Sequence, residues 1–384
     1  MAVNTSFYTT LNELMSRATG GTISAVVDYA SFVDAGKVLS AMSISDLTNE
    51  FLTPLMNKVQ KTINDNPSYQ GSLIDMYKGK LDYGVLETIM GSFYSMAAST
   101  FDGNTITTGQ TYTDQFTVNL PDKTVMYHSK SDSWELDITI RDTDLKGAFV
   151  SPQAMDAFIA SIMVDVANSL ELAKEDARLG VVSSMISYAA GAAADTTDET
   201  IGAVNYDLLA IYNAKFNTSL TADDCLNNDS FVRFAVATIK DIKKLMSKPS
   251  NKFNRKGFKT FTPLSKSKTK VNSLFEKAIQ VSVIDAYNVE NAVLGGEYET
   301  LPYWQNIDDR MRVTTNASGS TTYSPYVIAC LYDDRCIGEM VQLEDTEATR
   351  NAKRKYTNYH FQENYMYWEN QYANFVIFTL GSAT

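Results

Sequence analysis

Residues 151–191, SPQAMDAFIASIMVDVANSLELAKEDARLGVVSSMISYAAG, decide the fold because they predict one long helix. Ser151 is a favourable N-cap, and Pro152 suits the first helical position because its missing N–H would have no partner there. Apolar residues then recur at intervals of three and four, which places them on one helical face. These are Met155, Phe158, Ile159, Ile162, Met163, Val166, Leu170, Ala173 and Ala177. About 40 helical residues would span about 60 Å, far longer than an average globular helix.

The charged residues of this segment fall mostly off the apolar face. They are Asp165, Glu171, Lys174, Glu175, Asp176 and Arg178. Gly180 is expected to soften the helix at a cost of about 1 kcal/mol relative to Ala. Gly191, followed by a polar run, predicts the end of the helix. The segment is therefore expected to act as a rigid strut with one buried face.

The composition is that of an ordinary folded protein with a marked acidic balance. The 384 residues are 44% hydrophobic and 20% charged, with a formal net charge of −12. This charge argues against a general nucleic-acid binder, since duplex binding depends on basic residues that release counterions. It is compatible with a protein that encloses nucleic acid.

Targeting signals are not evident in the sequence. The first residues lack a basic then apolar signal, and no apolar run approaches the roughly 18 residues that a membrane helix needs. Cys225, Cys330 and Cys336 match no zinc or redox spacing, so a reducing cytosol is the simplest expected setting. The sequence therefore predicts neither classical secretion nor membrane insertion.

The region before the long helix divides into two expected parts. Residues 1–70 predict an N-terminal arm with helices. Residues 71–150 predict an extended β loop, because short β-prone runs such as FTVNL, TVMYH and WELDITI alternate with turn signals. This loop contains too little apolar sequence for a core of its own.

The region after the helix predicts a mixed α/β unit. One helix is expected over 203–217, and Asn228 or Asp229 is expected to cap a second that exposes Lys240, Lys243 and Lys244. Strands are expected in AIQVSVIDAY (278–287), YVIACLYDD (326–334) and CIGEMVQLE (336–344), and the last two form a hairpin candidate. Aromatic residues alternate with polar ones over 361–367, which predicts strands half buried on one face.

Residues 248–270 reverse the acidic balance of the chain. They contain eight basic residues and no acidic one, namely Lys248, Lys252, Arg255, Lys256, Lys259, Lys266, Lys268 and Lys270. One hypothesis is a nucleic-acid patch in which Phe253, Phe258 and Phe261 stack on bases. The other is a solvated loop or an intersubunit surface that faces acidic neighbours, and the net charge favours this second hypothesis.

No motif in the sequence specifies a reaction. The two histidines, His128 and His360, lie far apart and outside any catalytic motif, so both are expected to be structural or exposed. The pairs Asp308–Asp309 and Asp333–Asp334 offer oxygen ligands for a divalent cation, but adjacent acids in loops are usually solvated. We therefore predict no enzyme activity, no cofactor and no metal.

Four stretches carry a resemblance to a known family. They are KGKLDYGVLETIM (78–90), the run from VMYHSKSDSW to VDVANSL (125–170), TRNAKRKYTNYHFQENYMYWENQYANFVIF (349–378), and, more weakly, FNRKGFKTFTP (253–263) with FEKAIQVSVIDAYNVENAVLGG (275–296). In their order and spacing they resemble the major capsid proteins of tailed bacteriophages with the Hong Kong 97-like fold. The small podoviruses of the phi-twenty-nine group are the most similar.

This resemblance implies an α+β fold divided along the chain. The segment 78–140 would be an extended loop that overlaps a neighbouring subunit, and 151–200 would hold the spine helix of a peripheral domain. Residues 201–345 would form an axial domain at the centre of each capsomer. Residues 346–384 would return to the peripheral domain as strands.

The resemblance also implies a function and partners. The chain would assemble with itself, as hexameric and pentameric capsomers, into an icosahedral or prolate head shell around double-stranded DNA that it binds without sequence specificity. Portal and scaffolding proteins would be further partners, with assembly in the host cytoplasm and a final place in the virion capsid. The candidate intersubunit residues are Lys78, Lys80, Lys252, Arg255 and Lys256.

Two other functions stay open on the residues alone. One is a soluble α+β enzyme or binding protein whose site is assembled from scattered residues, and the other is a different virion structural protein, such as a tail or scaffold component. Particle size separates them, because a shell protein forms megadalton cages whereas an enzyme forms a small oligomer.

Overall fold

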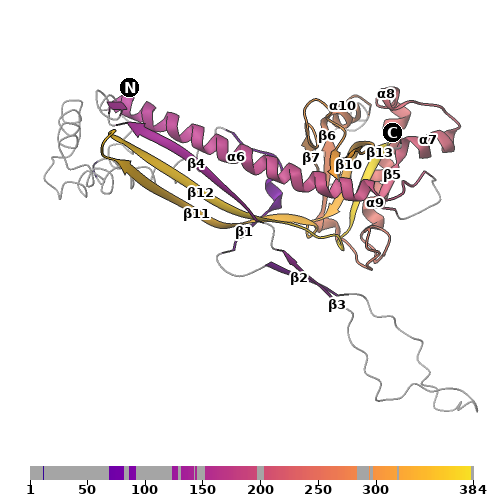
Figure 1. Ribbon diagram of the computed structural model, residues 1–384. Coiled ribbons are helices and arrows are strands. Elements are labelled where there is room, and N and C mark those ends of the chain that lie inside the picture. Colours follow the sequence, from indigo (N-terminus) through magenta and orange to yellow (C-terminus); the bar gives the residue numbers. More distant parts are fainter. Residues whose placement is uncertain are drawn as a thin grey trace, which may run out of the picture.

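The computed structural model combines one very long helix with two larger sheets and two short ribbons (Figure 1). It describes residues 12, 69–81, 86–91, 123–128, 131–141, 143–144, 152–196, 203–282, 294, 297–317 and 320–381, without the side chains of 152–163 and 315–323. The arm expected over 1–70 lies outside the described residues, apart from 12, 69 and 70.

Helix α6 (Pro152–Ala190) confirms the predicted strut. The first residues of its apolar face, up to Met163, lie outside the described side chains. Beyond them Val166 is buried, and the last turns bury Leu179, Val182 and Met185. These last turns pack into one apolar cluster with residues of both larger sheets, so the helix joins the two parts of the molecule.

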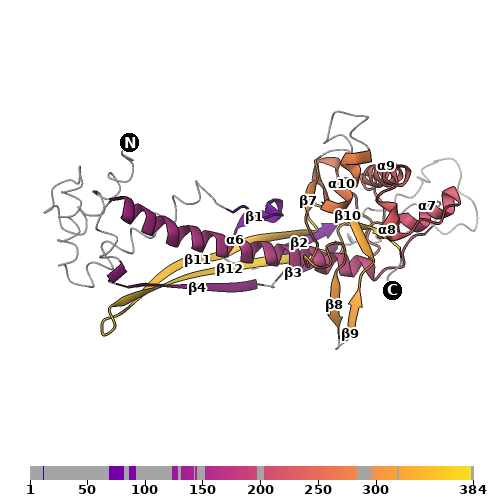
Figure 2. The same cartoon turned by 90° about the horizontal axis from the view of Figure 1, so that it is seen from above.

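A four-stranded sheet lies along α6 (Figures 1 and 2). Its order is β1 (Tyr77–Lys80), β11 (Ile337–Asn351), β12 (Tyr356–Glu369) and β4 (Ser131–Arg141). β11 and β12 are antiparallel neighbours along most of their length, and β12 is antiparallel to β4. The burial of β12 alternates with Tyr359, Phe361 and Tyr365 inward, which confirms the predicted period of two.

A five-stranded sheet forms the other part of the body. Its order is β5 (Asn205–Asp207), β13 (Phe375–Leu380), β10 (Tyr326–Asp333), β6 (Ser267–Asn272) and β7 (Glu299–Leu301). The helices around it are α7 (Leu208–Phe216), α8 (Ala222–Cys225), α9 (Asp229–Leu245) and α10 (Ser273–Ser282). Asn228 caps α9 through Phe231 N–H, as predicted. These helices and strands share an apolar core.

Shorter elements complete the described structure. The 3-10 helices are η2 (Ile74–Met76) and η3 (Leu264–Lys266), and the two-stranded ribbons are β2 (Leu86–Gly91) with β3 (Lys123–His128), and β8 (Thr314–Ala317) with β9 (Ser320–Tyr323). The β2–β3 ribbon projects away from the body (Figure 1).

The predicted hairpin of 326–334 with 336–344 is wrong. β10 pairs with β13 and β6, whereas β11 pairs with β1 and β12, so the two strands belong to different sheets. Asp333 carries the change of direction, because its buried carboxylate accepts hydrogen bonds from Arg335 and Thr262. At this turn the chain therefore passes from the five-stranded sheet to the four-stranded sheet.

The two larger sheets do not follow two of the expected domain boundaries. The boundary at residue 345 falls inside β11, and β13 joins the five-stranded sheet, so residues 346–384 do not stay together. The loop expected over 71–150 is an excursion only at β2–β3 among its described residues. β1 and β4 are edge strands of the four-stranded sheet and are held by the chain itself.

Three local predictions differ from the structure. The strand predicted over 278–287 is wrong for 278–282, which end α10, and 283–287 lie outside the described residues. The helix expected over 203–217 begins later, at Leu208, because β5 precedes it. Lys243 is buried rather than exposed, and its Nζ lies 3.2 Å from Thr269 Oγ1.

A buried ion pair fastens α6 to β11. Arg178 donates to both carboxylate oxygens of Glu339, with Nε–Oε2 at 3.0 Å and Nη2–Oε1 at 2.6 Å. The Glu339 side chain is 0% exposed and that of Arg178 is 6% exposed. Although burial opposes the charge, the hydrogen bond and charge of Glu339 raise the pKa of Arg178.

The neighbouring turn of α6 holds the segment before η2. Glu175 accepts hydrogen bonds from Ser72, through N–H and Oγ, and from Tyr69. Burial alone would raise the pKa of Glu175, yet these hydrogen bonds and the charge of Arg178 lower it. The prediction that Glu175 and Arg178 lie off the buried face is therefore wrong, because both side chains are buried, Glu175 with hydrogen bonds to Ser72 and Arg178 in an ion pair.

None of the described helices combines the length and apolar character that crossing a membrane requires.

We predict that Arg178→Met destabilises the folded chain by about 3–5 kcal/mol, because it leaves the Glu339 carboxylate buried without its partner. Urea unfolding followed by circular dichroism measures the change. The double variant Arg178→Met/Glu339→Leu removes both charges and should recover most of the loss. A single variant as stable as the parent chain would contradict the role given to this pair.

Candidate functional site: the projecting ribbon and its base

The β2–β3 ribbon presents an apolar face to solvent. Its strands pair from Leu86↔His128 to Gly91↔Lys123, so alternate residues share a face. Ile89 lies directly opposite Val125, and Tyr127 follows on the same side. These three side chains, here called the outer apolar face, are 59%, 43% and 70% exposed. An isolated two-stranded ribbon is at best marginally stable in water, so this exposure calls for a covering surface.

The opposite face of the ribbon is anchored to the body. Met90 and His128 are buried on this face, near opposite ends of the paired strands. The His128 Nε2 atom lies 3.0 Å from Thr88 Oγ1, and its ring centroid lies 6.3 Å from that of Trp368 on β12. Asn370 donates to the Met90 sulfur at 3.2 Å. The ribbon is therefore held to the body through this inner face.

Trp368 links this inner face to β11. It pairs with Gly338, and a Cβ atom added at residue 338 would lie 2.2 Å from the Trp368 ring. Real side chains do not approach so closely, so the tryptophan occupies the space that the glycine leaves open. This attachment thus depends on a close contact between β11 and β12.

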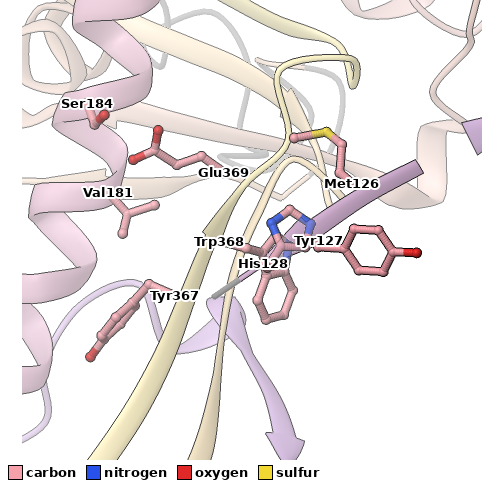
Figure 3. A pocket seen from close by; sticks show the side chains of 8 residues that line it. All are labelled: Met126, Tyr127, His128, Val181, Ser184, Tyr367, Trp368 and Glu369. Carbon is pink, nitrogen blue, oxygen red and sulfur yellow. The ribbon is translucent and has the colours of Figure 1, made fainter. Parts of the chain in front are cut away.

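A cavity of about 390 Å³ lies between the ribbon, α6 and β12 (Figure 3). It is lined by Met126, Tyr127, His128, Val181, Ser184, Tyr367, Trp368 and Glu369. The described polar contact of His128 is to Thr88, and neither Ser184 nor Glu369 bonds to it. This lining therefore offers no nucleophile and base in contact, and the cavity separates the ribbon base from the helix.

Burial lowers the pKa of His128 from its ordinary value of about 6.5. The imidazole is therefore neutral at the base of the ribbon near neutral pH, where it contacts Thr88 and an aromatic ring. This agrees with the expected structural role of His128. Protonation would place an uncompensated charge in an apolar contact.

The candidate intersubunit lysines near the ribbon lie on or beside β1. The Lys78 Nζ atom lies 2.6 Å from Asp334 Oδ1 and donates to the Asp75 carbonyl at 2.9 Å. Lys80 is exposed and lies opposite Val341 in the register of β1 and β11. Lys78 therefore serves a contact within the chain, and an intersubunit role for Lys80 stays a prediction.

The other candidates lie in the loop after α9. Arg255 donates to the carbonyls of Tyr188 at 2.5 Å and Gly191 at 3.1 Å, and its guanidinium lies 4.6 Å from the Tyr188 ring centroid. It thus caps the C-terminus of α6, where free carbonyls favour a cation. Lys252 and Lys256 are exposed, and their intersubunit role stays a prediction.

The basic stretch 248–270 is partly neutralised within the chain. Lys270 is 2% exposed and pairs with Asp75, at 2.7 Å, and with Glu299. Lys268 lies 3.6 Å from Asp75, and Lys266 lies 3.8 Å from Asp334. The acidic neighbours expected from other subunits are thus, for these three lysines, supplied by the same chain.

The aromatic residues of this stretch do not form a stacking platform. Phe253 is buried in the core, and Phe258 packs edge-on against Tyr372 with ring centroids 5.8 Å apart. Neither ring is free for a base. The nucleic-acid hypothesis for 248–270 therefore loses two of its three rings and three of its cations.

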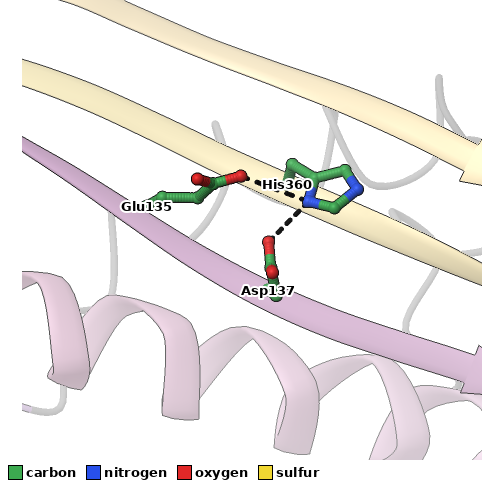
Figure 4. A group of neighbouring side chains, drawn as sticks. All are labelled: Glu135, Asp137 and His360. Atoms are coloured by element: carbon green, nitrogen blue, oxygen red, sulfur yellow. Dashed lines mark hydrogen bonds and ion pairs between the residues drawn. The ribbon is translucent and has the colours of Figure 1, made fainter.

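The acidic pairs considered for metals are engaged otherwise. Asp333 and Asp334 bind Arg335 and Lys78, and Asp309 lies 3.9 Å from Arg312. Instead, His360 lies beside Glu135 and Asp137 (Figure 4). Sequence analysis missed this group because β4 and β12 are far apart in the chain and only their register brings them together.

The cysteines are all free and buried. Burial raises the pKa of the Cys225 and Cys330 thiols to about 12 and that of Cys336 well above its ordinary value. Reactive cysteines need thiolate character and access, so these three behave as small apolar core residues.

The chain resembles known proteins in both sequence and fold. A family model described as Phi29-like phage major capsid protein matches residues 12–379. The fold is similar to a chain in the capsid structure of Staphylococcus phage Andhra, with a TM-score of 0.52, 8% identity, and coverage of 81% of this chain and 84% of that one. It is also similar to a chain in the structure of head fiber and inner core protein gp22 of native bacteriophage P68, with a TM-score of 0.54, 9% identity, and coverage of 82% and 86%. No curated protein sequence matches.

We predict that acid weakens the attachment of the ribbon. Since the folded pKa of His128 is lowered, the unfolded chain binds more protons between that pKa and about 6.5, and the free energy of unfolding falls as pH falls through this range. Urea unfolding at about pH 7.5 and about pH 5.5 measures the change. His128→Gln should reduce the pH dependence, whereas Lys353→Gln, at an exposed turn, should retain it. Equal pH dependence in the chain with and without His128 would contradict the assignment.

Proposed function

Because the chain belongs to the family of Phi29-like phage major capsid proteins, it is the major capsid protein of a tailed phage, and we propose that its projecting ribbon binds a neighbouring subunit of the shell. The chain has the α+β, Hong Kong 97-like fold of such proteins and forms part of the virion capsid. The single observation that carries the proposal is the outer apolar face of Ile89, Val125 and Tyr127.

Covering the outer apolar face in the shell would stabilise the assembly relative to the free chain. Covering an apolar side chain stabilises by about 25 cal/mol per Å² of apolar area removed from water. Apolar side chains that face solvent on a narrow ribbon are a mark of interaction sites. In a closed shell every subunit carries the same ribbon and the same surface for a neighbour's ribbon to contact. One contact is therefore repeated around the assembly.

The two larger sheets support an assignment of the chain to two domains within the shell. We assign α6 and the sheet β1-β11-β12-β4 to a peripheral domain, with α6 as its spine. We assign the five-stranded sheet and its helices to an axial domain at the centre of hexameric and pentameric capsomers. The boundary follows the two sheets, so β13 belongs with the axial domain.

The charge of the chain bears on how the shell holds its genome. A net charge of −12 disfavours tight contact with phosphates, so we propose that the shell encloses double-stranded DNA without sequence-specific binding. Assembly would take place in the host cytoplasm with portal and scaffolding proteins. Lys80, Lys252 and Lys256 remain candidates for contacts between subunits.

We infer a structural rather than a catalytic role, which the family match and the chemistry of the described residues support. The buried thiols have raised pKa values, and His128 is engaged at the base of the ribbon. The alternatives of an enzyme and of a tail or scaffold component are set aside, because the matching family is that of major capsid proteins.

We predict that Ile89→Asp blocks shell assembly while the subunit stays folded. The aspartate is solvated in a free subunit but would be buried without a partner at the proposed contact. Sedimentation and electron microscopy score the shells, and circular dichroism scores the fold.

Val281→Asp is a matched control, because Val281 is 71% exposed on α10, away from the ribbon. It should alter assembly less than Ile89→Asp. Normal shells from Ile89→Asp would rule out this face as the contact, whereas an unfolded variant would show that the ribbon is part of the subunit core.

A further inference from the structure

Three metal-ligating side chains converge on the solvent side of the four-stranded sheet (Figure 4). The His360 Nδ1 atom lies 2.5 Å from Asp137 Oδ1 and 3.4 Å from Glu135 Oε1. One donor atom from each of the three residues lies within 4.8 Å of the others. Asp137 is directly opposite His360 in the register, and Glu135 lies on the same face of β4.

The sheet fixes the backbone positions of these three residues. His360 alternates with Tyr359 and Phe361, both buried on the other face, so its ring lies on the outer side. The side chains of Glu135 and Asp137 are 53% and 61% exposed, and that of His360 is 24% exposed. The carboxylates can therefore adjust by rotation while the register of β4 and β12 keeps them beside the imidazole.

The three side chains contain more hydrogen-bond acceptor atoms than hydrogens that they can donate. Ionised carboxylates only accept hydrogen bonds, and Nδ1 of a neutral imidazole carries at most one hydrogen. The 2.5 Å contact to Asp137 occupies Nδ1, while the described donor to Glu135 Oε1 is Gln362 Nε2 at 3.5 Å, a long contact. A cation between the three atoms would satisfy all of them at once.

The surrounding charge favours a cation. Glu347 of β11 lies opposite His360 on its other side, and Asp345 lies opposite Gln362. Arg141 is the basic residue on this face of β4 among those described, and it lies four residues beyond Asp137, at the end of the strand. Four carboxylates thus surround one imidazole on adjacent strands of the same sheet.

We propose that Glu135, Asp137 and His360 bind a divalent first-row transition-metal ion. One nitrogen and two carboxylate oxygens suit Zn²⁺ or Co²⁺, whereas Mg²⁺ and Ca²⁺ prefer oxygen ligands alone. Water completes the coordination, because the group is open to solvent. The ion ties the edge strand β4 to β12 on the side of the sheet that α6 does not cover.

The test is calorimetric titration of the full-length chain with Zn²⁺, and separately with Mg²⁺. We expect one Zn²⁺ site per chain and at least tenfold weaker binding of Mg²⁺. His360→Gln and Asp137→Asn should each weaken Zn²⁺ binding at least tenfold. His128→Gln is the matched control, because it removes the other of the two histidines, and it should bind as the parent chain does.

A second measurement separates loss of the site from loss of the fold. The visible absorption of bound Co²⁺ should disappear in His360→Gln while the circular dichroism spectrum is unchanged. Equal Zn²⁺ affinity in His360→Gln and the parent chain, or loss of binding in His128→Gln with the fold intact, would overturn the proposal. So would a parent chain that binds no Zn²⁺, since the three groups would then be a hydrogen-bonded cluster alone.

Discussion

The buried pair of Arg178 and Glu339 is the interaction on which the rest of the structure depends. It joins the C-terminal third of α6 to β11 at the point where the two larger sheets meet the helix. A buried ion pair is costly to form and still more costly to break, because the remaining charge cannot reach water. Its value here is positional, since the planar guanidinium fixes both the rotation of α6 and the place of β11.

The same junction holds the segment that leads to the ribbon. Arg178 also contacts the Ser72 carbonyl, at 3.4 Å, and Glu175 accepts from Ser72. Lys270 then reaches from β6 to Asp75 of η2 and to Glu299 of β7. Charged side chains, which an amphipathic pattern places outward, thus tie residues 69–80 to both sheets.

Much of the fold could be predicted from local patterns. The apolar periodicity and the N-cap signals located α6, the Asn228 cap located α9, and alternation identified β12. Pairing between distant strands could not be predicted in this way. β10 and β11 are consecutive strands with a tight turn, yet they belong to separate sheets because β13 and β6 take both edges of β10.

The candidate site was less predictable than the fold. Lys243, Glu175 and Arg178 carry charge, so an amphipathic pattern places them outward, and their burial depends on partners elsewhere in the chain. The group of Glu135, Asp137 and His360 likewise exists only through the register of β4 and β12. Weak apolar content predicts an extended excursion over 71–150, but it does not reveal that β1 and β4 pair with the body, which leaves β2 and β3 as the described strands of this region outside the larger sheets.

The proposed partner of the ribbon, whose outer apolar face is exposed in the free chain, is a neighbouring subunit of the shell. Hydrogen exchange of the backbone amides in 86–91 and 123–128, compared between dissociated subunits and assembled shells, tests this most directly. We expect these amides to exchange fast in the subunit and to be protected in the shell, while the amides of β12 are protected in both. Equal exchange of the ribbon amides in the two states would contradict the account.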